Sequence, residues 1–116
     1  MIAMRSFERT KRVESLLKEA ISEVLLFSVS DPRLRGVVVT RVFVTKDLSL
    51  CRVYFRNYSL TRHEVMEGLQ ACKGYLRREV GHKVRLLRIP EFEFFYDDLP
   101  DKVTEVEELL KKVKDA

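Results

Sequence analysis

The spacing of apolar residues alternates between a helical and a strand period along the chain, and the first region is helical. Residues 8–29 place apolar side chains from Val13 to Leu25 three and four positions apart, which is one face of a helix. Pro32 ends this predicted helix, because a residue that precedes proline is kept out of the α conformation. The sequence therefore begins with an amphipathic helix.

Three segments rich in β-branched and aromatic residues predict strands: residues 37–45, 50–58 and 91–96. The polar residues 46–49 between the first two are suited to a hairpin loop. The middle strand alternates between an apolar face and a face of two arginines and a tyrosine: Cys51, Val53 and Phe55 against Arg52, Tyr54 and Arg56.

Helical spacing returns in residues 61–72 and 74–86, and a last helix begins at Pro100. Four apolar residues of that last helix are expected to face inward: Val103, Val106, Leu110 and Val113. The order α-β-β-α-α-β-α predicts an α+β fold in which helices cover one face of a small three-stranded sheet. The length of 116 residues fits one domain over residues 1–116.

Charge is distributed unevenly along the chain. Residues 51–90 carry nine basic and three acidic residues, whereas residues 91–116 carry four basic and nine acidic ones. The net charge of +4 therefore hides a basic body and an acidic end. Such a field attracts a polyanion to one side of a molecule, although many small proteins are mildly basic without such a role.

Several classes of protein are excluded by what the sequence lacks. No run approaches the roughly 18 apolar residues of a membrane span, and no segment resembles a secretion signal. Cys51 and Cys72 lack metal-ligand spacing and are expected as free thiols in a reducing cytoplasm. His63 and His82 have no metal-binding partner, and no nucleophile or phosphate-loop motif is present. We therefore expect no catalysis, no metal and no other cofactor.

Residues 71–90 contain six basic residues and one acidic residue. At about 100° per helical residue, four arginines of this stretch fall on one half of the predicted helix: Arg77, Arg78, Arg85 and Arg88. A row of guanidinium groups on a rigid helix can engage phosphates along a groove. A solvated helix face is the alternative, but such faces normally mix charges because like charges repel.

Basic residues also gather in two other places. Arg9, Lys11 and Arg12 lie near the start of the first helix, where cations oppose the helix dipole. Either a binding role or a frayed helix end accounts for them. The outer face of the 50–58 strand interleaves basic and aromatic residues as in proteins that bind single strands, but an ordinary exposed sheet face looks the same and is favoured.

Three stretches of the chain fit one family when they are taken in order. They are RTKRVESLLKEAISEVL followed by SDPRLRGV in residues 9–37, VTKDLSLCRVYF in residues 44–55, and GYLRREVGHKVRLLRIPEFEFFYDD in residues 74–98. These stretches resemble ribosome-binding factor A, a bacterial assembly factor of the small ribosomal subunit. The resemblance implies a KH-like domain of type II order, α-β-β-α-kink-α-β, with an additional C-terminal helix here. It also implies binding to immature small (30S) subunits and 16S rRNA, support for rRNA processing, and importance for growth at low temperature.

The resemblance also concerns the junction between the two middle helices. KH domains usually grip nucleic acid through a GxxG loop at this point, and the family has an Ala-x-Gly kink instead. The matching triplet here is Cys72, Lys73 and Gly74, and cysteine is small enough for such an interhelical kink. Longer family members carry a basic C-terminal tail, whereas this chain ends in KKVKDA, so no function of such a tail is expected.

The leading hypothesis is a monomeric, non-enzymatic factor that binds ribosomal RNA and the small ribosomal subunit through phosphates. The candidate RNA-binding residues are Arg9, Lys11, Arg12, Arg33, Arg35, Lys73, Arg77, Arg78, Arg85 and Arg88. The alternative is a protein-interaction module whose acidic end, Glu91 to Asp115, docks a basic ribosomal protein or an assembly GTPase. No membrane partner is expected.

Overall fold

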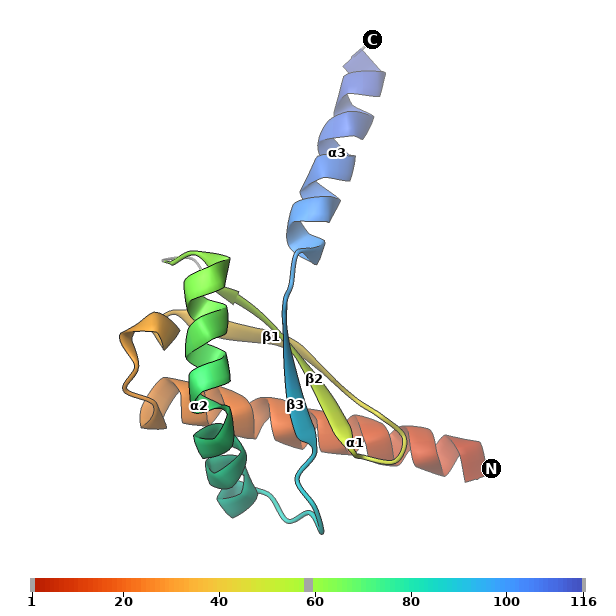
Figure 1. Ribbon diagram of the computed structural model, residues 1–116. Helices are drawn as coiled ribbons and strands as arrows, with labels where there is room; N and C mark the ends of the chain where they lie inside the picture. The colour runs from red at the N-terminus through yellow and green to blue at the C-terminus, as the bar shows by residue number, and fades with distance from the viewer. Residues whose placement is uncertain (1, 58–59, 116) are drawn as a thin grey trace.

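The computed structural model describes residues 2–57 and 60–115, and the side chains of residues 7–57, 60–99 and 101–114. Helices and strands follow one another along the chain as α1 (Ile2–Glu23), β1 (Val37–Val44), β2 (Leu50–Asn57), α2 (Arg62–Lys83), β3 (Glu91–Tyr96) and α3 (Leu99–Asp115). The predicted α+β class is confirmed, because α1 and α2 cover one face of the sheet (Figure 1).

The sheet has the order β1-β2-β3, with β2 antiparallel to β1 and parallel to β3. All three strands were predicted, and their observed bounds agree to within one residue over the part of the chain that the structure describes. The ladder between β1 and β2 shifts register at Thr40, which is a β-bulge on an edge strand. The backbone N–H of Val44, near the end of the same strand, donates to the Glu14 carboxylate of α1 at 3.1 Å. Both features make β1 a poor template for pairing with another chain.

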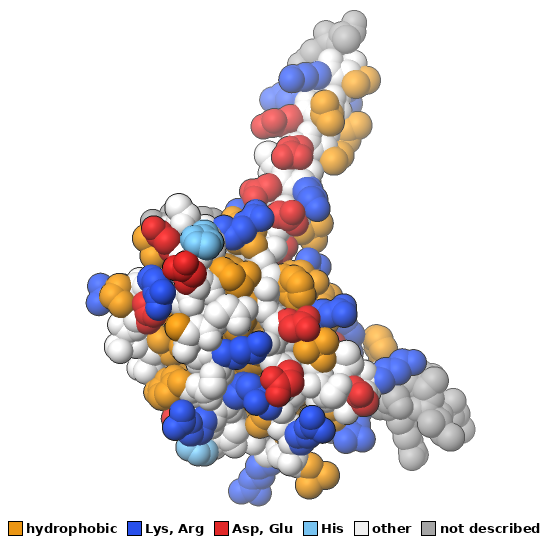
Figure 2. Space-filling model, in the orientation of Figure 1, with side chains coloured by type: hydrophobic (Ala, Val, Ile, Leu, Met, Phe, Trp, Pro, Cys, Tyr) orange, Lys and Arg blue, Asp and Glu red, His pale blue; other side chains and the backbone are white. Residues whose placement is uncertain are grey.

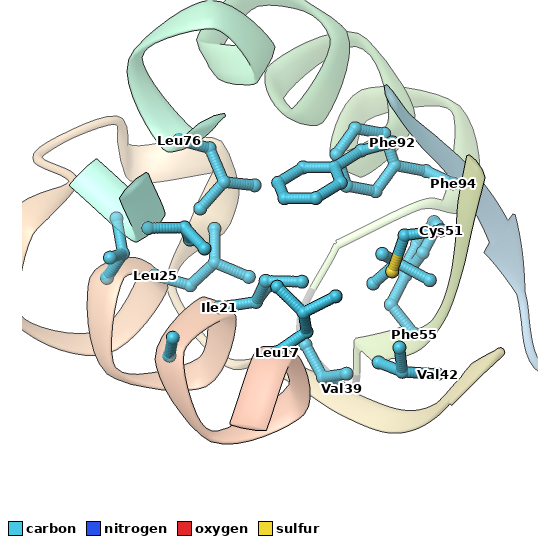
Figure 3. Packing of buried hydrophobic residues seen from close by; sticks show 14 of the residues in the cluster. Leu17, Ile21, Leu25, Val39, Val42, Cys51, Phe55, Leu76, Phe92 and Phe94 are labelled. Carbon is cyan, nitrogen blue, oxygen red and sulfur yellow. The ribbon is translucent and has the colours of Figure 1, made fainter. Parts of the chain in front are cut away.

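The hydrophobic core lies between the sheet and the two helices. Leu17 and Ile21 of α1 are fully buried, as the helical period predicts, and so are Phe55 of β2 and Phe92 of β3. In Figure 3 these side chains meet Leu76 of α2 in the same space. Each buried aromatic ring removes a large apolar area from water, so the contact between helices and sheet carries most of the hydrophobic stabilisation.

The end of α1 is a short π-helical turn, Val24–Ser28, after which Val29 is extended. The Asp31 carboxylate accepts a hydrogen bond from the backbone N–H of Arg33 at 2.9 Å and so opens a 3₁₀ turn, Pro32–Leu34. The predicted helix end before Pro32 is therefore confirmed. The predicted start at residue 8 is late, because the helix already begins at Ile2.

The prediction of two separate helices in residues 61–86 is wrong, because α2 is one continuous helix. Its predicted cap is confirmed: the Thr61 hydroxyl accepts a hydrogen bond from the backbone N–H of Glu64 at 3.3 Å. Cys72, Lys73 and Gly74 lie within this helix, since a single glycine costs a helix only about 1 kcal/mol and no proline interrupts the hydrogen bonds. The kink expected at these three residues stays a prediction.

The last helix, α3, projects away from the rest of the molecule (Figure 1). The prediction that its apolar residues face inward is wrong, because their exposed fractions run from 47% at Val103 to 74% at Val113. Figure 2 shows hydrophobic side chains along one side of α3 and charged ones along the other. Among the described residues, no helix has the length and apolar character needed to cross a membrane.

Two glycines of α2 provide a matched test of its packing. A Cβ at Gly74 would meet nothing within 4 Å, whereas a Cβ at Gly68 would lie 3.0 Å from Cδ2 of the buried Leu34. We expect Gly74→Ala to raise the free energy of unfolding by about 0.5–1 kcal/mol through helix propensity. Gly68→Ala gains the same propensity but overpacks the contact with the 3₁₀ turn, so we expect it to be net destabilising by about 1 kcal/mol. Thermal unfolding of both variants decides this, and equal stabilisation would contradict the close approach at Gly68.

Candidate nucleic-acid interface

The predicted row of arginines on a helix does not exist, because α2 ends at Lys83 and Val84 is already extended. Arg85 and Arg88 lie in the segment of residues 84–90 that joins α2 to β3. In the same segment the Leu87 side chain, which was expected on an apolar helix face, is fully exposed at 109%. The predicted helix face was therefore wrong beyond Lys83, because Arg85, Leu87 and Arg88 are not helical.

Arg77 does not present its charge to a ligand but holds this segment against α2. Its Nε donates to the carbonyl of Pro90 at 3.1 Å, and its Nη2 donates to the carbonyl of Ile89 at 2.9 Å. Its Nη1 also lies 3.4 Å from the Glu91 carboxylate. Arg77 thus fixes the path of the backbone that carries Arg85 and Arg88, and is better described as a positioning residue than as a phosphate contact.

Three of the predicted basic residues come together at one groove, although the sequence places them far apart. The groove has a volume of about 450 Å³ and lies between the start of α1, the hairpin loop and the segment 84–90. Its lining residues are Arg9, Asp47, Leu48, Ser49, Arg85, Leu86, Leu87 and Arg88. Figure 2 shows that Lys and Arg side chains gather over the lower half of α2 and the segment that follows it.

The three arginines of the groove are available for a ligand. Arg9, Arg85 and Arg88 are exposed, and none of them forms an ion pair within the described residues. Unpaired guanidinium groups that line one groove favour a doubly hydrogen-bonding anion such as a phosphate. The site thus consists of three positive charges that no carboxylate among the described residues neutralises.

The hairpin loop contributes a carboxylate that the sequence analysis missed. Asp47 Oδ1 accepts hydrogen bonds from the Ser49 hydroxyl at 2.7 Å, the Thr45 hydroxyl at 2.7 Å and the Ser49 backbone N–H at 3.1 Å. These bonds lower the pKa of Asp47 to about 2, so the group is ionised at neutral pH. The pattern Thr-x-Asp-x-Ser in residues 45–49 is the signal that could have shown this turn.

The other predicted residues lie elsewhere, and some are engaged. Arg33 forms a two-pronged pair with Asp31, with its Nη2 2.7 Å from Oδ2, and lies 3.9 Å from Glu67. Lys11 lies 3.7 Å from Glu14 on α1. The remaining four are on the surface without lining the groove: Arg12 on α1, Arg35 before β1, and Lys73 and Arg78 on α2.

The residues of the expected kink lie within α2 and form no site of their own. The Cys72 thiol packs against the core, and its Sγ donates to the carbonyl of Leu69 at 3.6 Å. Burial raises the pKa of Cys72, so it stays a neutral thiol. Gly74 is exposed and approaches no other element.

The outer face of the sheet is an aromatic layer that is mostly occupied by the protein's own groups. Tyr54 stacks on Phe95 at 5.4 Å between ring centroids, and the Arg41 guanidinium lies 4.4 Å from the Tyr54 ring. Arg56 donates to the carbonyl of Asp97 at 2.6 Å and pairs with the Asp101 carboxylate at 3.2 Å. An ordinary exposed sheet face accounts for this pattern.

Metal binding finds no support in the part of the chain that the structure describes. No group of three or more His, Cys, Asp or Glu side chains is close enough to hold an ion there.

A three-stranded mixed sheet of this order, covered by two helices on one face, places the protein in the α+β class with KH-like topology. The family model of ribosome-binding factor A matches residues 9–110, and the chain belongs to this family. The expectation from the sequence is therefore confirmed.

Individual relatives agree with this assignment. A ribosome-binding factor A of Halothermothrix orenii is 40% identical over 110 residues, which cover 93% of this chain and 90% of the relative. That of Sorangium cellulosum is 39% identical over 114 residues, covering 94% and 91%. The crystal structure of ribosome-binding factor A from Thermus thermophilus is similar, with a TM-score of 0.71 and 28% identity over 75% of this chain and 93% of that one. A homology model of the Thermus thermophilus protein, fitted into a cryo-EM map of its 30S complex, has a TM-score of 0.65, 28% identity and coverages of 74% and 92%.

Proposed function

We propose that this chain binds immature small (30S) ribosomal subunits by holding phosphates of 16S rRNA at the arginine-lined groove. The observation that carries the proposal is the meeting of Arg9, Arg85 and Arg88, each without an ion pair among the described residues. Family membership supports the partner, because the related Thermus thermophilus protein has been fitted into a 30S complex. The protein acts as a non-enzymatic, monomeric factor in the cytoplasm, with residues 1–116 forming one domain.

The finer role we infer is help with late subunit maturation and rRNA processing, with greatest importance at low temperature. The family supports this inference. The physical basis is that a bound protein holds an RNA conformation by its phosphates without reading the base sequence. Misfolded RNA pairings are long-lived in the cold, so a factor that favours one conformation matters most there.

The proposal is tested by reversing the charge of the groove. We expect the triple variant Arg9→Glu, Arg85→Glu and Arg88→Glu to bind small subunits on the order of 100-fold more weakly, because three phosphate contacts are lost. The dependence of binding on salt should fall as well, by about 0.7 in the logarithmic slope for each contact with a single strand. Co-sedimentation with immature 30S subunits at several salt concentrations measures both quantities.

A control of equal charge change comes from α3, where Lys111, Lys112 and Lys114 are exposed and lie away from the groove. Reversing these three lysines should leave subunit binding near that of the wild type. The proposal is wrong if the groove variant co-sediments like the wild type, or if both variants lose the same affinity.

The exposed α3 favours a second candidate function, a docking helix for a basic ribosomal protein. Its apolar residues follow a spacing of four and three from Leu99 to Val113, and acidic residues dominate its first half. A helix of this kind suits an apolar groove rimmed by basic residues. This alternative predicts that the triple charge-reversal variant binds subunits normally, which the co-sedimentation reveals. It also predicts that the wild type has no affinity for protein-free 16S rRNA, which a separate binding measurement with that RNA reveals.

A further inference from the structure

We propose that the groove is a binding site for one nucleotide of single-stranded RNA, with separate places for the phosphate, the base and the ribose. The phosphate lies against Arg85, Arg88 and Arg9, and the base packs on the leucines of the groove. The ribose 2′-hydroxyl donates to Asp47. This inference rests on the proposed function and names the part of the RNA that the groove receives.

The phosphate subsite follows from where the arginines come from. Arg9 is on a helix, and Arg85 and Arg88 are on a segment that Arg77 fastens to α2. A Cβ at Gly81 would lie 3.4 Å from Cγ1 of Ile89, which is an ordinary van der Waals distance, so the segment also passes close to the end of α2. The guanidinium groups are therefore attached to a supported backbone, so only the arginine side chains have to be ordered when an anion binds.

The apolar subsite is made of three leucines. Leu48 and Leu86 are partly buried and pack on the core, which gives the groove a firm floor. Leu87 is fully exposed, although it contacts a cavity of about 450 Å³. This volume is within the range of roughly 300–1,000 Å³ that small-molecule sites have. The flat face of a base would cover the exposed Leu87 side chain and remove it from water.

The carboxylate of Asp47 distinguishes a nucleotide from a bare phosphate. A negative charge beside three arginines weakens the binding of a simple anion, so a pure phosphate site would not contain it. The three hydrogen bonds that Asp47 accepts from Thr45 and Ser49 all end on Oδ1, so neither residue occupies Oδ2. Oδ2 can accept a hydrogen bond from a ligand hydroxyl, and the 2′-hydroxyl is the donor that RNA has and DNA lacks.

The ligand is single-stranded because its base must leave the stack to reach the leucines. Bases inside a duplex are covered on both faces, and side chains recognise them mostly after they have been splayed out of loops, bulges or ends. Three different segments border the groove, so a strand can cross it between the hairpin loop and residues 84–90.

The test is fluorescence anisotropy with a labelled single-stranded RNA hexamer of mixed sequence, its DNA counterpart and the matching RNA duplex. Arg85→Ala should weaken RNA and DNA binding alike by roughly tenfold, because a phosphate contact is lost from both. Leu87→Ala should weaken binding of the single strands by roughly fivefold and leave duplex binding unchanged. The control Leu109→Ala removes another exposed leucine, on α3, and should change nothing.

Asp47→Asn keeps one oxygen as the acceptor for Thr45 and Ser49 at the turn and replaces the second with an NH2 group, which donates and cannot accept. We expect the wild type to prefer the RNA hexamer over DNA roughly fivefold, and the variant to lose this preference. A thermal unfolding curve like that of the wild type verifies that the turn is intact in the variant. If the variant is unfolded, the ratio of RNA to DNA affinity of the wild type alone tests whether the ribose 2′-hydroxyl is bound.

The outcomes separate this inference from the proposed function. If Arg85→Ala weakens binding while Leu87→Ala and Asp47→Asn bind like the wild type, the groove holds only phosphates and the nucleotide site is refuted, with subunit binding intact. Equal affinity of the wild type for RNA and DNA refutes the 2′-hydroxyl contact. Normal subunit binding by the triple charge-reversal variant refutes the proposed function itself.

Discussion

Phe92→Ala is expected to lower the free energy of unfolding by about 4 kcal/mol. Phe92 is completely buried at the start of β3, where its ring meets Leu76 of α2 and Phe94 in Figure 3. Removing the ring loses its transfer free energy and leaves a cavity that the rigid sheet and helices cannot fill. Urea unfolding followed by circular dichroism measures the loss, which consumes a large part of the stability of a typical domain.

Phe95 on the same strand provides the control, because it points to the other face and is 38% exposed. Its ring stacks on Tyr54 at the surface, so Phe95→Ala should cost about 1 kcal/mol. A similar loss from the two substitutions would mean that the outer face of the sheet is covered in solution.

Asp97→Ala is expected to have the second-largest effect, lowering the free energy of unfolding by about 3 kcal/mol. This carboxylate is 4% exposed just after β3 and joins three elements. It accepts hydrogen bonds from the Thr40 hydroxyl at 2.5 Å and the Leu99 backbone N–H at 3.1 Å, and it lies 3.3 Å from Nε of Arg41. The buried Nε of Arg41 has no hydrogen-bond partner among the described residues. Removal of the Asp97 carboxylate would therefore also leave it without a counter-charge.

The same carboxylate makes stability depend on pH. Burial alone would raise the pKa of Asp97, but the hydrogen bonds from Thr40 and Leu99 and the charge of Arg41 outweigh it and lower the pKa below its usual range. Because the folded state binds the proton less readily than the unfolded chain, the contribution is complete above about pH 4 and is lost as the pH falls further. Unfolding curves of the wild type and Asp97→Asn should therefore converge in acid and differ most at neutral pH.

Asp98 is the matched control for this prediction. It is adjacent in the chain but more exposed, and its contact with Lys102 at 3.3 Å is an ordinary pair one helical turn apart. Asp98→Asn should change stability by about 0.5 kcal/mol or less. Parallel pH profiles for the wild type and Asp97→Asn would show that the Asp97 network contributes nothing.

Local patterns were sufficient to predict the strands, the end of α1 and the cap of α2. The β-branched run before Thr45 and the alternation of residues 50–58 fit a strand and hardly any other local structure. A proline or a capping threonine determines a helix end within a few residues. The division of residues 61–86 into two helices was wrong because helix propensity is a weak preference that packing along both halves of α2 overrides. The burial predicted for α3 was wrong because amphipathic spacing tells which face is apolar but not whether anything covers it.

The groove could be predicted only in part. Arg9, Arg85 and Arg88 were recognised as basic residues, but their meeting depends on the path of residues 84–90, which Arg77 fixes through hydrogen bonds to the carbonyls of Ile89 and Pro90. The same contacts explain why Arg77 is not itself available to a ligand. Asp47 was taken for a loop residue because a carboxylate next to a predicted phosphate site has meaning only when the neighbours in space are known.

Because α3 projects away from the rest of the molecule, the free energy of its unfolding is separate from that of the core. The 17 residues of α3 only slightly exceed the about 12–15 below which isolated helices are marginal in water, and its apolar residues from Val103 to Val113 are exposed. Its unfolding would expose almost no new apolar surface and would leave the core unchanged. The C-terminal segment is then a tether of two lengths, about 25 Å when helical and about 55 Å when extended. A partner that packs on the apolar side of α3 would stabilise the helical, shorter form, because it would bury the leucines and valines that are now exposed.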